Sequence, residues 1–252
     1  MEFSRRQGLK VASYPPKQDL GDTSLAKPSS STLQLEWTGE ERQQLSSGEW
    51  AVQLQTSRGP IETRFHPAAE NTPLSGGVVW VGGSGGGLDG PARGLYPAAC
   101  QQLQRKGVAG LRLHYRFPND LPECVLDTLL GVKFLAAQGV ERAALVGHSF
   151  GGAVVISAGA LSPQVQAVVP MSTQTYGTDL APQVAPRPML LIHDDADEVL
   201  PDRCSRQVFS LAQEPKELVI YRGARHGLDQ CREELLELLV TWIPAHLVSS
   251  GE

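Results

Sequence analysis

From Val78 onward, short apolar runs alternate with helical patterns, and this rhythm limits the possible fold more than any other feature of the chain. The apolar runs are GVVWV, VAGLRLHY, AALVG, VQAVVPM, PMLLIH and KELVIY. They are rich in Val, Ile and Leu, which is typical of strands buried on both faces. The segments between and after them predict helices near 95–106, 122–138, 151–161, 201–212 and 228–243. The sequence therefore predicts an α/β fold, with a mostly parallel sheet flanked by helices.

The front of the chain follows different patterns. Residues 1–32 are rich in Ser, Pro and Lys and show no periodicity, so we expect a flexible N-terminal arm. The segment EWAVQLQTSRGPIETRFHP indicates two alternating strands around a turn at 57–60. Such an antiparallel hairpin would lie at one edge of the sheet. We expect a single domain over residues 33–252, because a chain of this length can bury a large core.

Charge and cysteine content are typical of a cytoplasmic protein. The net charge of −5, without a basic block, argues against nucleic acid or an anionic membrane as a partner. The four cysteines are far apart and form no CxxC pair, which predicts reduced thiols and no metal site. A twin-arginine motif at Arg5 lacks the apolar segment that an export signal needs behind it. The uncharged run 143–178 is interrupted by glycines and Pro163, so we expect buried strand, turn and helix there rather than a membrane span.

The segment Gly147-His148-Ser149-Phe150-Gly151 follows the apolar run AALVG and opens a predicted helix. It matches G-x-S-x-G in the strand–turn–helix context that this motif requires. In such a tight turn the serine backbone is strained, and its hydroxyl is exposed above the sheet. The residues two before and two after the serine come close to it and must lack side chains, which two glycines satisfy. Ser149 is therefore the predicted nucleophile.

A serine hydroxyl needs a base that removes its proton, and the chain has six histidines. Two of them precede the serine, which is the wrong chain order, and one lies in the last predicted helix. His148 adjoins the serine, and we expect its side chain to point elsewhere. His193 ends a strand and is expected to support the loop that follows. His226 directly follows KELVIY and is the predicted base.

The acid that orients the histidine should lie between the serine and the histidine, just past the end of a strand. The segment HDDADEVLP, residues 193–201, offers four acids there, and spacing alone does not choose among them. They are Asp194, Asp195, Asp197 and Glu198.

With these motifs, residues 78 to about 243 resemble an α/β-hydrolase of the serine esterase and dienelactone-hydrolase-like branch. In that group the acid loop reads His-Gly-x-x-Asp, followed by a small apolar residue and Pro. Laid on residues 193–201, the resemblance implies Asp197 as the orienting acid. Asp194 stands where the pattern has Gly, so Asp194 and Asp195 remain alternatives. Dienelactone hydrolases have cysteine where this chain has Ser149, so dienelactone is not the expected substrate.

The stretch VVWVGGSGGGLDGP, residues 78–91, joins a strand to a glycine loop for which three functions compete. A phosphate loop would need Lys and Ser or Thr where Leu88 and Asp89 stand. A dinucleotide loop would need an acid at the end of the next strand, and LRLHYR contains none. The third function, an oxyanion hole, requires backbone N–H groups and close approach of the backbone to the substrate, which glycine permits.

An oxyanion hole takes one N–H from this loop and one from the residue after the nucleophile, here Phe150. In the hydrolases that the chain resembles, the early strand commonly ends in His-Gly-x, and Gly82-Gly83-Ser84 takes that place. The resemblance therefore implies Ser84 as the first donor. Gly83 and Gly85 are its neighbours at the substrate.

Together these residues predict a serine hydrolase that acts on small carboxylic esters, with a small-molecule acyl substrate and water as reactants and no cofactor. Thioesterases, peptidases and acyltransferases use the same triad, and a non-catalytic ligand receptor on a hydrolase scaffold is a further alternative. Residues 171–187 are too short and irregular for a helical cap, so we expect an accessible site that prefers short acyl groups, with Tyr176 at its rim. The sequence leaves the oligomeric state open.

Overall fold

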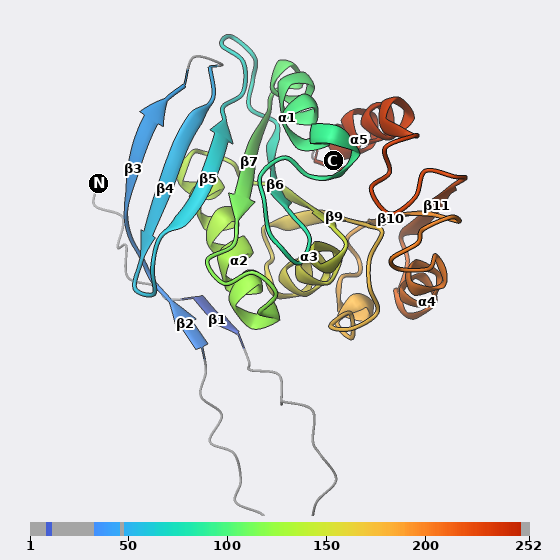
Figure 1. Cartoon of the computed structure of the whole chain (residues 1–252). Helices are drawn as coiled ribbons and strands as arrows, with labels where there is room; N and C mark the ends of the chain where they lie inside the picture. Colours follow the sequence, from blue (N-terminus) through green and yellow to red (C-terminus); the bar gives the residue numbers. More distant parts are fainter. Residues whose placement is uncertain (1–8, 12–32, 46–47, 248–252) are drawn as a thin grey trace, which may run out of the picture.

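The computed structural model describes residues 9–11, 33–45 and 48–247, and within them nine strands form one sheet (Figure 1). The strand order is β11-β10-β9-β8-β6-β7-β5-β4-β3. These strands are β3 (Trp37–Gln44), β4 (Trp50–Thr56), β5 (Ile61–His66), β6 (Gly76–Val81), β7 (Val108–His114), β8 (Ala143–His148), β9 (Val165–Met171), β10 (Met189–Asp194) and β11 (Lys216–Tyr221). The α-helices are α1 (Pro91–Leu103), α2 (Leu121–Ala137), α3 (Phe150–Leu161), α4 (Arg203–Leu211) and α5 (Arg232–Leu247), with the short 3-10 helix η1 (Gln104–Lys106) after α1.

The strands from β11 to β7 pair in parallel, and those from β7 to β3 pair antiparallel. Every residue of β6 and β10 is buried, which explains the apolar stretches GGVVWV and MLLI in these strands. The sheet is thus mostly parallel, with an antiparallel N-terminal edge. This arrangement confirms the predicted α/β fold class.

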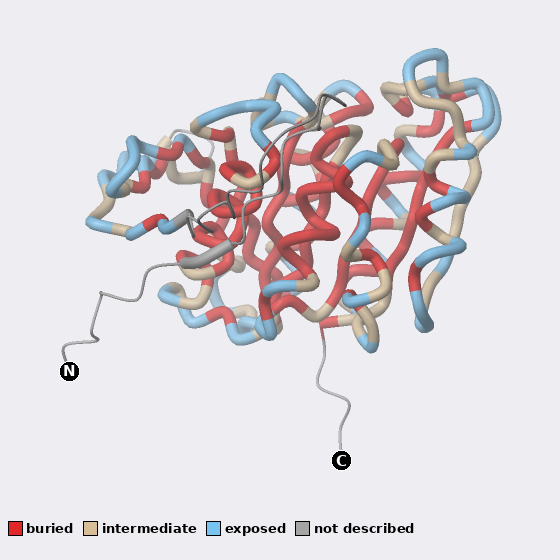
Figure 2. Tube along the Cα trace, turned by 90° about the horizontal axis from the view of Figure 1, so that it is seen from below, coloured by how far each residue is buried: buried red, intermediate tan, exposed pale blue. Residues whose placement is uncertain are grey.

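Helices cover both faces of the sheet and bury a core on each. Leu126 of α2 and Val154 of α3 belong to the core of one face, and Tyr96 of α1 and Leu239 of α5 belong to the core of the other. Figure 2 shows buried residues through the middle of the molecule and exposed ones around its periphery. The central strands are therefore covered on both faces.

The N-terminal edge differs from the sequence-based expectation in two places. The predicted hairpin is present as β4 and β5, but β3 adds a third strand outside it. Its residues 41–44 are all exposed, so it carries no apolar alternation that would have identified it. In addition, β1 (Leu9–Val11) pairs with β2 (Leu33–Leu35) in a separate two-stranded sheet. Three residues of the predicted arm therefore form a strand, and its other residues lie outside the described part of the chain.

The segment between β9 and β10 forms a loop rather than a cap over the strand ends. Its one regular element among the described residues is the 3-10 helix η2 (Ala181–Gln183). The segment packs closely on the start of α2, because a side chain at Gly177 would come within 2.4 Å of Leu121 Cδ2. The predicted lack of a sizeable cap domain is confirmed. Separately, none of the described helices combines the length and the apolar character needed to cross a membrane.

The order of the central strands marks the place where a site is expected. From β6 the chain passes to β7 on one side and then returns to β8 on the other. In open parallel sheets, ligands bind at the carboxyl ends of strands where the connection changes direction in this way. The glycine loop follows β6 and Ser149 follows β8, so both lie at this switch point.

Candidate active site

Ser149 occupies a sharp turn between β8 and α3. Its φ is 58° and its ψ −120°, a strained conformation for a residue with a side chain. A Cβ at Gly147 would lie 2.1 Å from the carbonyl oxygen of Gly151, and a Cβ at Gly151 would lie 2.3 Å from that of Gly82. Both glycines are therefore required, and the turn is held by the backbone of the glycine loop as well as its own.

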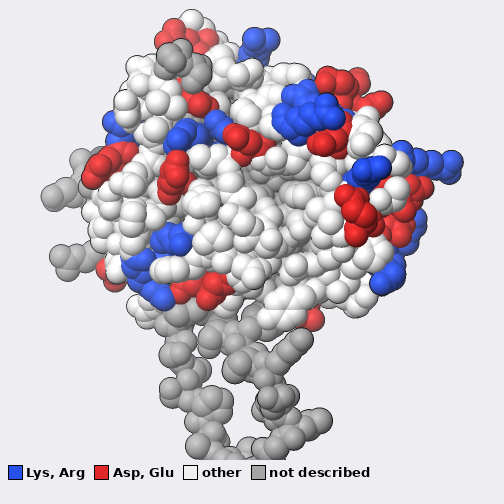
Figure 3. Space-filling view, in the orientation of Figure 1, with Lys and Arg blue, Asp and Glu red and all other residues white. Residues whose placement is uncertain are grey.

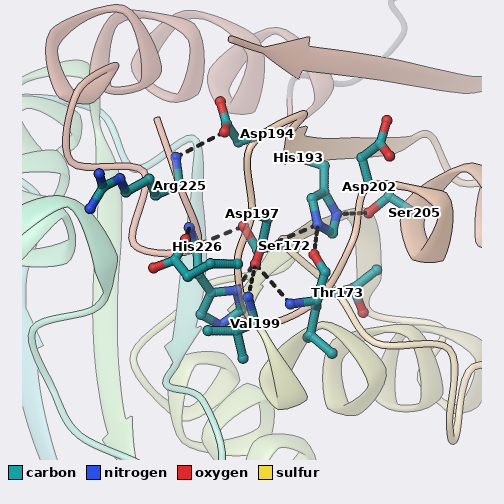
Figure 4. Close-up of polar contacts among 12 residues, drawn as sticks. Ser172, Thr173, His193, Asp194, Asp197, Val199, Asp202, Ser205, Arg225 and His226 are labelled. Atoms are coloured by element: carbon teal, nitrogen blue, oxygen red, sulfur yellow. Dashed lines mark hydrogen bonds and ion pairs between the residues drawn. The ribbon is translucent and has the colours of Figure 1, made fainter. Parts of the chain in front are cut away.

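The structure brings His226 and Asp197 together across two loops (Figure 4). His226 follows β11 and Asp197 follows β10, and His226 Nδ1 lies 2.7 Å from Asp197 Oδ2. The other carboxylate oxygen accepts hydrogen bonds from the backbone N–H groups of Val199 and Leu200, both at 2.8 Å. Burial alone would raise the pKa of Asp197, but these hydrogen bonds outweigh it and hold that pKa below its ordinary value. The carboxylate is thus kept ionised beside the imidazole.

The neighbouring aspartates make different contacts. Asp194 is fully buried and accepts three backbone N–H groups, from Ala196, Ala224 and Arg225, at 2.7–2.9 Å. Asp195 accepts one, from the backbone of the loop after β11, at 3.2 Å. Both carboxylates therefore tie the acid loop to the loop that carries His226. Of the three aspartates, Asp197 is the one whose carboxylate contacts the imidazole.

His193 supports the acid loop, as its position at a strand end predicted. Its ring is fully buried, and its Nε2 lies 2.8 Å from the Leu200 carbonyl and 3.1 Å from Asp197 Oδ2. Its Nδ1 lies 2.6 Å from Ser205 Oγ on α4. The carboxylate of Asp197 is thus fixed from two sides.

His148 corrects one expectation, because its side chain does not point away from the site. Its Nε2 lies 2.8 Å from the backbone carbonyl of His226, and the two imidazole rings are 4.8 Å apart between centroids. A carbonyl only accepts hydrogen bonds, so Nε2 carries the proton and Nδ1 is free to accept. Burial lowers the pKa of His148 to about 4, which keeps the ring neutral near pH 7. No sequence pattern indicates this contact, since the direction of a side chain in a tight turn depends on the tertiary structure.

Two hydrogen bonds tie the turn of Ser149 to the loop that carries His226, through the end of β9. Ser149 N donates to the Met171 carbonyl at 2.8 Å, and the next residue, Ser172, places its hydroxyl 3.3 Å from the carbonyl of His226. Within the described residues, no hydrogen bond joins Ser149 Oγ to the His226 ring. Such bonds are often long in enzymes without substrate and shorten when substrate binds.

The glycine loop approaches Ser149 with no side chain in between. Gly86 N donates to the Gly83 carbonyl at 2.9 Å, which closes a turn with Ser84 and Gly85 exposed at its tip. A Cβ at Gly83 would lie 3.5 Å from Ser149 Cβ. A cavity of about 300 Å³ opens here, lined by residues 82–83 and 86–91 and by His148. Ser84 and Gly85 are not among its lining residues.

Residues of β7 hold the glycine loop from behind. His114 Nδ1 accepts the N–H of Gly87 at 2.9 Å, and Tyr115, just past the strand, donates its hydroxyl to the Gly82 carbonyl at 3.2 Å. The buried Arg112 donates to the Leu88 carbonyl at 3.2 Å. Sequence reasoning did not identify these residues, because they support the loop from a strand that follows it in the chain.

Arg112 also joins a cluster of charged and polar groups. Its guanidinium contacts the carboxylates of Asp89, at 3.0 Å, and Glu49, and its Nε donates to His66 Nε2 at 3.0 Å. Burial and the Arg112 charge lower the pKa of His66 to about 4, against the opposing influence of Glu49. His66 is therefore neutral near pH 7, and the four side chains together carry one net negative charge.

Three further features describe the surroundings of the site. Tyr176 is 63 % exposed in the loop after β9 and does not line the cavity. The face seen in Figure 3 has few charged side chains at its centre, and Lys, Arg, Asp and Glu surround that centre. Among the described residues, no cluster of His, Cys, Asp or Glu has the arrangement of a metal site.

The comparisons with known families agree with this architecture. The model of the family described as the dienelactone hydrolase family matches residues 112–237, half of the chain, and this range contains Ser149, Asp197 and His226. Over 73 residues the chain is 36 % identical to YfhR of Escherichia coli strain K12, an uncharacterized protein. That match covers 26 % of this chain and only 25 % of YfhR.

Solved structures share the fold over most of the chain. A dienelactone hydrolase from Anabaena variabilis superposes with a TM-score of 0.65 and 22 % identity, covering 79 % of this chain and 97 % of that one. A serine hydrolase without a lid from Xanthomonas campestris superposes with a TM-score of 0.64 and 18 % identity, covering 81 % of this chain and 97 % of that one. An esterase domain from Rhodothermus marinus superposes with a TM-score of 0.58 and 19 % identity, covering 85 % of this chain and 100 % of that one. At these identities the likeness concerns the fold, which is that of the α/β-hydrolases.

Proposed function

The chain belongs to the dienelactone hydrolase family, and we propose that it is a serine hydrolase that cleaves small carboxylic esters. The observation that carries the proposal is the contact of 2.7 Å between Asp197 Oδ2 and His226 Nδ1, beside the strained turn of Ser149. A histidine held by a buried carboxylate through Nδ1 presents its Nε2 as a base. The serine hydroxyl is the group that needs one.

In the proposed first step, Ser149 Oγ attacks the ester carbonyl carbon while His226 Nε2 takes the hydroxyl proton. Asp197 keeps His226 in the correct tautomer and stabilises the imidazolium that forms. When the tetrahedral intermediate collapses, the bond to the alkoxy group breaks and His226 returns the proton to it, which releases an alcohol. The acyl group remains on Ser149.

In the second step, His226 takes a proton from water, and the resulting hydroxide attacks the acyl-enzyme. The carboxylic acid leaves and Ser149 regains its proton. The net reaction consumes one ester and one water and forms one acid and one alcohol. We propose no cofactor, nucleic acid or membrane partner for this chemistry.

The negative oxygen formed in both steps needs donors that are already in position. We assign one to the backbone N–H of Phe150, which begins α3, where the helix dipole also favours negative charge. We assign the other to Ser84 in the glycine loop. The 3.5 Å spacing between a Cβ at Gly83 and Ser149 Cβ supports this, because the loop backbone reaches the nucleophile without a side chain between them.

A labelling and turnover experiment tests the proposal. A fluorophosphonate probe should label Ser149 and no other serine, and Ser149→Ala should abolish the labelling. Ser210→Ala, which changes an exposed serine on α4, is the matched control. Turnover should then be measured with an ester, a thioester and an amide of the same acyl group.

We expect repeated turnover with the ester as the best substrate. Faster cleavage of the thioester or amide would replace the ester assignment with one of those activities. Labelling without turnover on any substrate would indicate a ligand receptor rather than an enzyme. Labelling at another serine would contradict the site itself.

A further inference from the structure

The cavity beside Ser149 has walls that are already fixed in place. Gly86 N is bonded to the Gly83 carbonyl, Gly87 N to His114 Nδ1, and the Leu88 carbonyl to Arg112. The end of the glycine loop is joined to the loop of His226, because Ala92 N donates to the Gly227 carbonyl at 2.7 Å. Small-molecule sites are usually formed before the ligand arrives, and this cavity meets that condition.

The polar side-chain groups of this cavity are hydrogen-bond acceptors. His148 Nδ1 is unprotonated, since Nε2 donates to the His226 carbonyl, and it lies 3.9 Å from a Cβ placed at Gly83. Among the described residues, Nδ1 has no hydrogen-bond partner. The second group is the Asp89 carboxylate, whose side chain is 77 % exposed.

The cation that contacts Asp89 does not reverse this character. Arg112 is buried, and its guanidinium already contacts Asp89, Glu49 and the Leu88 carbonyl. The cluster of Arg112 with Glu49, Asp89 and neutral His66 therefore retains one net negative charge. A carboxylate in the cavity would meet two acceptors and the net negative charge of this cluster, whereas a hydroxyl could donate to either acceptor.

We propose that this cavity binds the part of the substrate next to the scissile ester, and that it selects an uncharged group with a hydrogen-bond donor over a carboxylate. The substrate class is thus a small ester that carries a hydroxyl near its carbonyl, in the acyl or in the alcohol portion. This inference rests on the proposed function only in taking Ser149 as the reacting group. It sets the protein apart from a hydrolase for acidic substrates.

Three ethyl esters of equal shape test the acyl portion: ethyl 3-methylbutanoate, ethyl 3-hydroxybutanoate and monoethyl malonate. They place an isopropyl, a hydroxyethyl and a carboxylate group at the same position. Three acetates test the alcohol portion in the same way: isobutyl acetate, 2-hydroxypropyl acetate and acetoxyacetate. In the series whose variable group occupies the cavity, kcat/KM should be about tenfold higher for the hydroxyl compound than for the carboxylate, the effect expected of one charge-assisted hydrogen bond.

Two variants connect this selectivity to the cavity. Asp89→Asn removes the negative charge at position 89, so kcat/KM for the carboxylate compound should rise several-fold relative to that for the hydroxyl compound. Glu62→Gln, which changes an exposed acid on β5, is the matched control. Gly83→Ala adds a methyl group with no contact closer than 3.5 Å, so it fits the fold but narrows the cavity. It should lower kcat/KM for the branched compounds more than for ethyl acetate. Gly39→Ala, with open space around its Cβ, is the control.

Binding to Ser149→Ala separates this inference from the proposed function. Ethyl 3-hydroxybutanoate or 2-hydroxypropyl acetate should shift the imidazole NMR signals of His148, and the matching carboxylate should not at the same concentration. Selective binding without turnover in the wild type would leave the cavity assignment intact and reject the hydrolase. Equal or better use of the carboxylates by an active wild type, or a preference unchanged by Asp89→Asn, would overturn the cavity assignment.

Discussion

At the scale of single residues, the acid loop separates three aspartates that the sequence places side by side. Asp197 contacts the imidazole of His226, whereas Asp194 and Asp195 hold backbone N–H groups. Sequence spacing could not distinguish them, because the direction of each carboxylate depends on where the loop after β11 lies. The family pattern points to Asp197, and the contact agrees with it. The direction of the His148 side chain was predicted wrongly, since no sequence pattern shows that its ring lies beside that of His226.

These contacts predict unequal effects of substitution. Asp197→Asn should lower kcat about 10⁴-fold, because the amide favours the wrong tautomer of His226. Asp195→Asn loses only part of one hydrogen bond of 3.2 Å and should change kcat little. Steady-state kinetics on both variants would check the assignment. A larger loss in Asp195→Asn would mean that the loop is arranged differently in solution.

The two neutral histidines predict a loss of stability in mild acid. In the folded chain the pKa values of His66 and His148 are lowered to about 4. Between pH 6.5 and 4 these two side chains are therefore protonated in the unfolded chain but not in the folded one. Their contribution to stability is present above pH 6.5 and falls as the pH drops toward 4, by at most ~1.4 kcal/mol per pH unit for each histidine. Asp127, whose pKa burial raises to about 6, opposes part of this loss.

Urea unfolding between pH 5 and 6.5 would measure the effect. The free energy of unfolding of the wild type should decrease toward pH 5, and His66→Asn should weaken that dependence by one proton. An identical slope in the two proteins would mean that His66 is not held neutral in the folded state.

At the scale of the elements, the glycine loop and the serine turn are built against each other. The Gly82 carbonyl lies where a Cβ at Gly151 would be, and Tyr115 holds that carbonyl from β7. The buried strands around this site could be predicted from the sequence. β9 has the predicted bounds, and β8 extends one residue beyond its predicted end. Strand β3 could not be predicted, because its exposed polar residues show no alternation of apolar and polar side chains. The contact of Arg112 on β7 with Glu49, which directly precedes β4, joins segments far apart in the chain, so no local pattern reveals it.

A substitution in the serine turn should test this close packing. Gly147→Ala would place a methyl group 2.1 Å from a backbone oxygen, so the turn must distort or the protein must unfold more easily. We expect a loss of roughly 3 kcal/mol or more in the free energy of unfolding, with loss of fluorophosphonate labelling. Gly39→Ala should leave both unchanged. Normal stability and labelling in Gly147→Ala would contradict the geometry of the turn.

At the scale of the whole molecule, the site lies at the switch point of a sheet that no cap domain covers within the described part of the chain. The loop between β9 and β10 contains η2 as its one regular element among the described residues, so this segment places no helical cap above Ser149. The fold class and the lack of a cap were predictable, because they depend on long apolar runs and on the length of one segment. The volume and polarity of the cavity were not, since they depend on how the glycine loop folds back toward Ser149.

An uncovered site predicts a preference for short acyl chains. Each methylene adds about 0.8 kcal/mol of binding only where a wall buries it. Along a series of p-nitrophenyl esters, kcat/KM should therefore be highest between about two and six acyl carbons and then stop rising. A value that continues to increase beyond about eight carbons would mean that a further apolar surface covers the chain.

The proposed chemistry depends on an acyl-enzyme at Ser149, and the Ser149→Ala substitution removes its nucleophile. The rate of p-nitrophenyl butyrate hydrolysis should be measured for the wild type and for Ser149→Ala, with circular dichroism to show that both are folded. Removal of the nucleophile should lower kcat roughly 10⁴–10⁶-fold, because only binding and the oxyanion donors remain. A folded Ser149→Ala protein that keeps more than about a tenth of the wild-type rate would contradict the proposed chemistry, since that residual rate would require another nucleophile.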